Sequence, residues 1–205
     1  MKTLLVALAT LLLSLGASAD EFKAAADKAL AAGEPAAILK ALEKEIYRGN
    51  IVAAQHLGFL YRDGKHVKQD YALARKWLEV GASHDWKRLK HKRGLADAQY
   101  ALGIMLRDGV GGKPDIQQAA KWLHQAAEQG EAQAQVTLAQ LHLDGKGIKQ
   151  DIEQAFVWAS IAANWLTEAA KKVAEHIRDL AQKQLNPRQL ENAEKLVSTW
   201  TAKTL

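Results

Sequence analysis

Three stretches of the sequence combine glycine with acidic and basic residues, as phosphate-binding and calcium-binding loops do. They read RDGKHVKQDYALARKWL from Arg62, RDGVGGKPDIQQAAKWL from Arg107 and LDGKGIKQDIEQAFVWA from Leu143. A phosphate loop requires G-x-x-x-x-G-K-[ST], but here Gly112 and Lys113 are followed by Pro114. A calcium loop places acids at alternating positions, whereas Lys146 and Lys149 lie among the acids of the third stretch and would repel the ion. Both kinds of site are therefore disfavoured.

The other side chains that carry chemistry form no catalytic or metal-binding pattern. None of the histidines makes the i, i+4 pair around a glutamate that zinc hydrolases use; they are His56, His66, His84, His91, His124, His142 and His176. The absence of cysteine excludes disulfides and thiol catalysis. Neither G-x-S-x-G nor S-x-x-K occurs. We therefore predict no catalytic residue, no metal ligand and no cofactor.

The three stretches belong to a longer unit that is repeated along the chain. Each copy aligns on the residue that follows a leucine, which is Gly58, Gly103 or Ala139. Further offsets carry matching residues in all three copies: Gly49, Gly94 and Gly130; Ala53, Ala98 and Ala134; Gly64, Gly109 and Gly145; Asp70, Asp115 and Asp151; Ala74, Ala119 and Ala155; Trp77, Trp122 and Trp158. The second and third anchors are 36 residues apart, and nine inserted residues, 85–93, separate the first two further. Such self-similarity is typical of repeat proteins.

Each unit is predicted to fold as two helices joined by a turn. In the first unit, Ala53, Leu57 and Leu60 follow the spacing of an apolar helical stripe. Gly64 suits the left-handed residue that ends a helix, and Asp70 suits the N-cap of the next. The later copies show the pattern of a capping box, Asp115 with Gln118 and Asp151 with Gln154.

The alanines, tryptophans and small anchors of each unit are predicted to form the core. Ala74 and Trp77 lie three residues apart, on one helical face, and the later copies repeat this spacing. A small anchor such as Gly58 lets the two helices approach closely. The tryptophans are therefore interpreted as packing residues and not as a stacking platform for sugars or bases.

The unit A-x-x-x-L-G-x-x-Y-x-x-G-x-G-V-x-x-D-x-x-x-A-x-x-W resembles the Sel1-like repeat, a relative of the tetratricopeptide repeat. The resemblance covers residues 50–164. His66 departs from the pattern at the second glycine of the turn, and Ala139 departs from it after the leucine. The resemblance implies an exported bacterial all-α protein, a right-handed α/α solenoid of helix-turn-helix repeats, which acts as an interaction scaffold.

The two ends of the chain predict a signal peptide and capping helices on either side of the repeats. Lys2, an apolar run and the small residues 17–19 are typical of a secretory signal peptide cleaved before Asp20. We expect a mature protein that is periplasmic or secreted and is not an integral membrane protein. The predicted segments are the signal peptide 1–19, a degenerate helix pair 20–49, repeats at about 50–84, 94–129 and 130–164, the insertion 85–93, and C-terminal capping helices 165–205. The first capping helix is predicted over 165–185, and Asn186, Pro187 and Gln189 predict the start of the last.

Similarity to tetratricopeptide grooves implies that a partner binds along the first helices of the repeats. The implied positions lie three before, one after and four after each anchor: Gln55, Phe59, Arg62, Tyr100, Ile104, Arg107, Val136, Gln140 and Leu143. Arginines spaced by one repeat suit an acidic or carboxylate-ending peptide. We therefore predict a protein or peptide partner.

The insertion offers a second surface. Its basic residues and tryptophan are Trp86, Lys87, Arg88, Lys90, Lys92 and Arg93. The segment is either a solvated extension or a contact for an anionic envelope surface or polymer. Nucleic acid is not expected as a partner of an exported protein. The alternatives to a non-enzymatic interaction module are thus a binder of anionic polymer and a penicillin-interacting or β-lactamase-like envelope enzyme.

Overall fold

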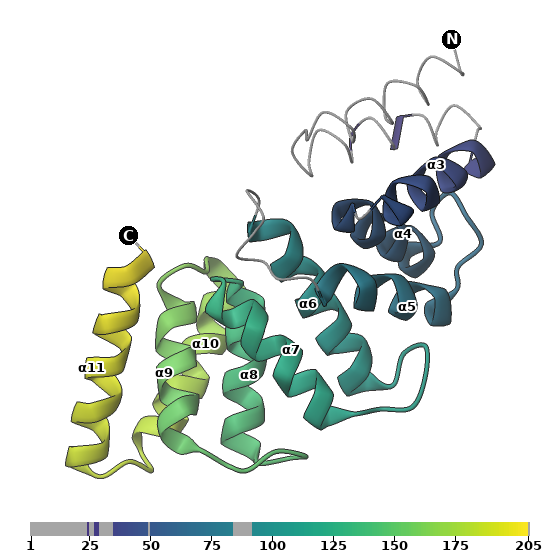
Figure 1. The fold of residues 1–205 in the computed structure, drawn as a ribbon. Coiled ribbons are helices and arrows are strands. Elements are labelled where there is room, and N and C mark those ends of the chain that lie inside the picture. The colour runs from purple at the N-terminus through teal and green to yellow at the C-terminus, as the bar shows by residue number, and fades with distance from the viewer. Residues whose placement is uncertain (1–23, 25–26, 29–34, 49, 84–91, 205) are drawn as a thin grey trace. The chain divides into compact units, whose positions relative to one another are not determined.

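A computed structural model describes residues 24, 27–28, 35–48, 50–83 and 92–204 of the 205-residue chain. It divides into two compact units, Met1–Pro114 and Asp115–Leu205, and each unit is described by itself. All regular secondary structure in the described residues is helical (Figure 1). The signal peptide 1–19, residues 20–23 and most of the predicted insertion lie outside the described residues.

The first unit contains the helices α3 (Pro35–Tyr47), α4 (Ile51–Asp63), α5 (Tyr71–Ala82) and α6 (Lys92–Asp108). Helix α5 packs against both α4 and α6, and α4 also contacts α3 and α6. The core contains Leu42 and Leu57, which are almost fully buried and share one apolar cluster. Gly58 allows a close approach of α4 and α5, because a Cβ there would lie 2.7 Å from Cγ of Leu78. This confirms the role predicted for the first small anchor.

The second unit contains α7 (Ile116–Glu128), α8 (Ala132–Asp144), α9 (Ile152–Ala163), α10 (Glu168–Gln182) and α11 (Pro187–Thr204). Helix α9 is the centre of this unit, because α8, α10 and α11 all pack against it. Its side chains are accordingly buried around much of its circumference. Trp158, on α9, is 5% exposed, which confirms its predicted place in the core. The equivalent Trp77 and Trp122 are only half-buried.

The helix ends follow the sequence pattern. Gly64 and Gly145 end α4 and α8 with φ of 64° and 65°, values that only glycine adopts readily. Asp70, Asp115 and Asp151 each accept a hydrogen bond from the backbone N–H three residues ahead. The reciprocal capping box forms in full at the start of α11, between Asn186 and Gln189. The predicted aspartate caps are thus confirmed, whereas the predicted reciprocal box of Asp151 with Gln154 does not form, because the N–H of Asp151 donates to His142 O at 3.0 Å.

The second glycine of the turn joins one repeat to the repeat before it. Gly111 has φ of 79°, and a Cβ there would overlap the backbone carbonyl of Tyr71, the first residue of α5. Gly147 has φ of 78°, and a Cβ there would lie 2.7 Å from Cβ of Ile116, the first residue of α7, so it meets a side chain where Gly111 meets backbone. The first repeat has His66 at this position. The glycine is therefore needed where two full repeats stack.

The structure corrects the bounds of the first capping helix. The predicted helix 165–185 is confined to Glu168–Gln182. Thr167 is extended, with φ −120° and ψ 156°, so the helix cannot begin at Trp165. At the other end, Gln184 and Leu185 donate to carbonyls only three residues back, as a terminating turn does.

Candidate functional site

Five of the predicted groove residues lie on the first helices of two successive repeats in the first unit, α4 and α6. We call this surface the α4/α6 face and define it by Phe59, Arg62, Tyr100, Ile104 and Arg107. The two helices contact each other, and all five side chains are half-buried. The face therefore joins apolar surface to two guanidinium groups at equivalent positions of the repeat.

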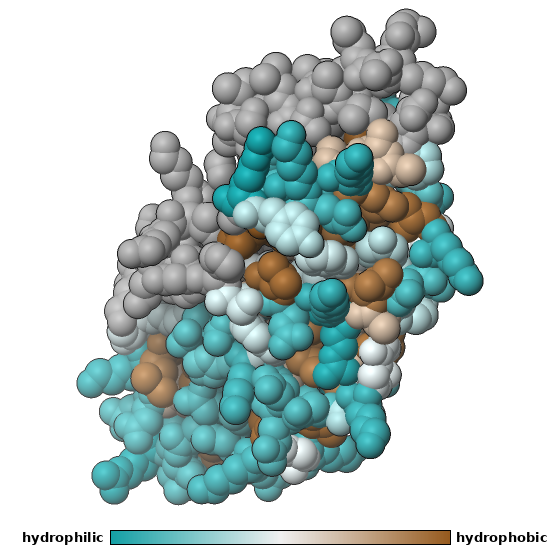
Figure 2. Space-filling model, turned by 45° about the vertical axis from the view of Figure 1, so that its right-hand side comes forward, coloured by the Kyte–Doolittle hydropathy of each residue, from teal (hydrophilic) through white to brown (hydrophobic). Residues whose placement is uncertain are grey.

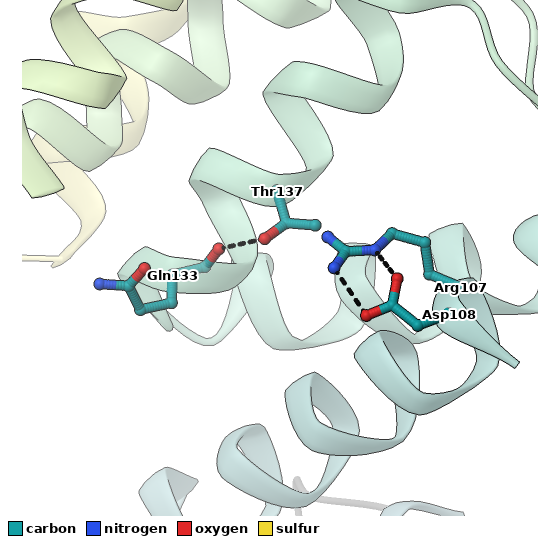
Figure 3. A network of polar contacts seen from close by, with 4 residues as sticks. All are labelled: Arg107, Asp108, Gln133 and Thr137. Carbon is teal, nitrogen blue, oxygen red and sulfur yellow. Dashed lines mark hydrogen bonds and ion pairs between the residues drawn. The ribbon is translucent and has the colours of Figure 1, made fainter. Parts of the chain in front are cut away.

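Both arginines of the α4/α6 face are paired with the aspartate that follows them. Arg62 donates from Nε to Asp63 at 2.7 Å, and its guanidinium carbon lies 4.5 Å from the centre of the Phe59 ring. Arg107 donates from Nε and Nη2 to the two oxygens of Asp108, at 2.7 and 2.9 Å (Figure 3). These contacts hold each guanidinium in a fixed orientation.

The Arg107–Asp108 pair shifts both ionisations toward the charged forms. The hydrogen bond from Arg107 is the main cause that lowers the pKa of Asp108, and the same bond raises the pKa of Arg107. The arginine side chain remains 35% exposed and that of Arg62 38%. Each pair thus presents fixed N–H donors to solvent beside a carboxylate that already neutralises part of the charge.

The other predicted groove residues are placed differently. Gln55 is only 7% exposed, and a Cβ on Gly81 of α5 would meet its backbone. Val136, Gln140 and Leu143 belong to the second unit, where Leu143 is 8% exposed and Val136 packs against an alanine cluster. Gln140 is exposed and donates to Asp144 at 2.8 Å. Gln55 and Leu143 therefore offer little surface to a partner.

The basic insertion falls mostly outside the described residues. Trp86, Lys87, Arg88 and Lys90 are not described, and Lys92 and Arg93 form the first turn of α6. Among the described residues, no three His, Asp or Glu side chains are grouped to hold a metal ion. No described helix combines the length and the apolar character that a membrane span requires.

Comparison with known proteins identifies the repeat. The family model described as "Sel1 repeat" matches residues 51–85, 96–131 and 132–164, which together make up about half of the chain. The chain belongs to the Sel1 repeat family. This confirms the family predicted from the sequence. No curated protein matches the chain.

Solved structures of other Sel1 repeat proteins are similar. A Sel1 repeat protein from Oxalobacter formigenes is 26% identical, with a TM-score of 0.55, over 74% of this chain and 56% of that one. A protective antigen present in uropathogenic Escherichia coli strains, which displays an SLR fold, is 27% identical, with a TM-score of 0.48, over 95% of this chain and 48% of that one. The chain thus spans about half the length of each. The predicted all-α solenoid class is confirmed.

The Sel1 repeats also use a buried glutamine that the sequence patterns did not single out. Gln99 and Gln135 lie four residues before their anchors and are fully buried. Their amides donate to Ala82 O at 3.2 Å and to Ala127 O at 3.0 Å. Each carbonyl lies at the end of the preceding second helix, where backbone acceptors lack helical partners. The first repeat has Ala54 at this position. The alignment of the repeats therefore contains a signal for stacking, a glutamine four residues before the anchor of the second and third repeats.

The second unit contains a hollow of about 710 Å³ between α7, the end of α8 and the connector of the third Sel1 repeat. Leu138 and Ile148 supply apolar surface, and Lys121, Lys149 and His142 supply polar groups. Burial is the main cause that lowers the pKa of His142, with His124 adding to the effect and Asp151 opposing it. No motif in the sequence marks this hollow, because its residues come from two repeats.

Proposed function

We propose that the protein is a non-enzymatic interaction module that binds an extended acidic segment of a partner protein on the α4/α6 face. Sel1 repeat proteins generally mediate protein–protein interaction. The observation that carries the proposal is the pair of oriented guanidinium groups, Arg62 and Arg107, at equivalent positions of successive repeats beside half-buried apolar side chains.

The chemistry of the face suits carboxylates on an extended chain. A guanidinium has five N–H donors, and the neighbouring aspartate takes one donor of Arg62 and two of Arg107. The remaining donors can bind a carboxylate of the partner through charge-assisted hydrogen bonds. Because the guanidinium groups are already oriented, the arginine side chains lose less conformational entropy when a partner binds. Phe59 and Ile104 add apolar contact beside the charges.

The surface character is consistent with such mixed recognition. On the face shown in Figure 2, hydrophobic side chains reach the surface in separate patches among hydrophilic ones. A partner that met this kind of surface would need both apolar and charged groups. The signal-like residues 1–19 support the bacterial envelope as the setting, with cleavage before Asp20 and a periplasmic or secreted mature protein.

The partner can be found by placing a photo-crosslinking amino acid at Ile104 in cells and identifying the captured protein. Its affinity for the purified chain is then measured for Arg62→Glu/Arg107→Glu. Hydrogen bonds to charged groups contribute about 1.5–3 kcal/mol each, so the double variant should bind about 100-fold more weakly or worse. Unchanged affinity would contradict the proposal.

A matched control exists in the second unit. Arg178 donates from Nε and Nη2 to the adjacent Asp179, and its side chain is 34% exposed. Arg178→Glu therefore introduces the charge change made at each arginine of the double variant into the same kind of pair, on a helix that is not part of the α4/α6 face. It should leave the affinity for the partner within about twofold of the original.

A further inference from the structure

The hollow in the second unit corresponds, position by position, to a filled place in the first. In the register of the repeats, Ala120 on α7 is equivalent to Arg75 on α5, since each follows its capping aspartate by five residues. Arg75 extends across to the connector of the next repeat and donates to Lys113 O at 3.1 Å. A Cβ on Gly112 would lie 2.7 Å from the Arg75 guanidinium. The first unit thus fills this place with an arginine over a glycine.

In the second unit, different residues stand at both positions of the contact between Arg75 and Gly112. Ala120 ends at Cβ, and Ile148 stands where the first unit has Gly112. The space that the arginine would occupy is left open, and apolar carbon from Ile148 and Leu138 lines it. At about 710 Å³, the hollow lies within the usual range of small-molecule sites. It arises from specific exchanges between repeats and not from loose packing of the shared pattern.

The polar groups of the hollow favour an anion. Lys121 and Lys149 line it from α7 and from the connector, and neither forms an ion pair with another described residue. The equivalent lysine of the first unit, Lys76, instead lies over the Trp77 ring at 5.3 Å. Asp151 is the acidic group in the lining, and one of its oxygens accepts the N–H of Gln154. Two unpaired ammonium groups therefore face one carboxylate that is partly engaged.

A buried polar atom in the lining also lacks a partner. Nδ1 of His142 is buried and makes no hydrogen bond within the described part of the chain. The first unit has Leu106 at this position, so the imidazole is another exchange that adds polarity to the hollow. The ring of His124, also in the lining, packs in a T-shaped arrangement with Trp158, with 5.7 Å between the ring centroids. Histidine nitrogen, lysine ammonium and apolar carbon thus converge on one space.

We propose that this hollow binds a ligand that carries one carboxylate on an apolar body, with Lys121 and Lys149 binding the carboxylate and Leu138 and Ile148 contacting the apolar part. A free organic acid and the C-terminal residue of a peptide share this chemistry. The site lies in the second unit and does not depend on the α4/α6 face.

The test uses two matched pairs of probes: 3-phenylpropionate with its amide, and a hexapeptide that ends in phenylalanine, with a free or an amidated C-terminus. Binding to the purified protein is measured by calorimetry and located by NMR shifts of amides in residues 117–125 and 147–151. A carboxylate probe should bind at least about tenfold more tightly than its amide. Tighter binding of the peptide acid would identify a polypeptide terminus as the source, and tighter binding of the small acid would identify a free acid.

Two variants separate charge from volume. Lys121→Gln/Lys149→Gln should weaken carboxylate binding by at least about tenfold, while Lys76→Gln/Lys113→Gln, the equivalent lysines of the first unit, should not change it. Ala120→Leu fills the hollow with neutral carbon and should abolish the located shifts. The lysine variants alter exposed side chains and decide the charge assignment even if Ala120→Leu does not fold. The proposal is overturned if neither carboxylate shifts these amides, if the amides bind as well as the acids, or if the Lys121/Lys149 variant retains full affinity.

Discussion

The contact of Gly111 with the start of α5 predicts that even a methyl group at this glycine separates two repeats. Gly111 has φ of 79°. A Cβ there would lie 2.7 Å from the carbonyl carbon of Tyr71 and closer still to its oxygen. Both are backbone atoms at the first turn of a helix, so they cannot rotate away as the end of a flexible side chain can. Gly111→Ala therefore forces the connector of the second repeat away from α5.

Two contributions set the size of the effect. An L-residue in the left-handed region costs about 1–2 kcal/mol, and the overlap adds about 1–3 kcal/mol, as overpacking usually does. Gly111→Ala should thus lower the free energy of unfolding by about 2–5 kcal/mol. Gly130 is the matched control, because its φ is 90° and a Cβ there would meet nothing within 4 Å. Gly130→Ala should cost only the conformational contribution, about 1–2 kcal/mol.

Urea unfolding, followed by circular dichroism at 222 nm, measures both free energies. Hydrogen exchange then locates the loss, which for Gly111→Ala should appear in α5 and α6 of the first unit. If the two variants are destabilised equally, the backbone contact with Tyr71 has no energetic importance, and the assigned role of the second glycine in stacking is wrong.

Three further predictions concern the Arg75 hydrogen bond, the pKa of His142 and the absence of catalysis. Arg75→Ala removes the hydrogen bond to Lys113 O and should lower the free energy of unfolding by about 0.5–1.5 kcal/mol in the same urea assay. The pKa of His142 is lowered from its ordinary 6.5 by burial, with Asp151 opposing and His124 adding to this effect, so folding favours the neutral ring. Its contribution to stability is then complete above pH 6.5 and is lost as the pH falls below that value. His142→Leu, which restores the residue type of Leu106, should make the midpoint of urea unfolding depend less on pH below 6.5. The purified protein should not hydrolyse nitrocefin, and turnover above a heat-inactivated sample would instead support the envelope-enzyme alternative.

Much of the local structure was predictable because its causes lie within a few residues. Gly64 ends α4 through its own left-handed backbone, and Asp70 caps α5 through the N–H of Leu73. Asn186 and Gln189 bond each other across three residues. The predicted start of α10 at Trp165 was wrong although Thr167 is of a residue type that favours the N-cap. Thr167 makes no side-chain cap hydrogen bond, and only its extended backbone in the structure marks the true start.

Burial across repeats was harder to predict. The spacing that placed Gln55 in the groove gives its direction on α4 and does not reveal that Gly81 brings α5 against its backbone. Gln135 is fully buried and donates to Ala127 O, an acceptor eight residues away in another helix. The aspartates that pair with Arg62 and Arg107 were adjacent in the sequence, yet only the structure shows that the side chains turn toward each other.

The hollow of the second unit shows where new function arises in a repeated fold. Residues shared by the repeats, such as the capping aspartates and connector glycines, already have structural roles. Each aspartate caps a backbone N–H group, and the glycines allow close packing. Positions where the repeats differ are free of these roles and can open a binding site. Ala120 with Ile148 in place of Arg75 with Gly112 is such a difference, and it changes a filled contact into an open, lysine-lined space. In a solenoid each repeat thus serves as a structural reference for the next, and departures from the shared pattern are the first residues to test for ligand binding.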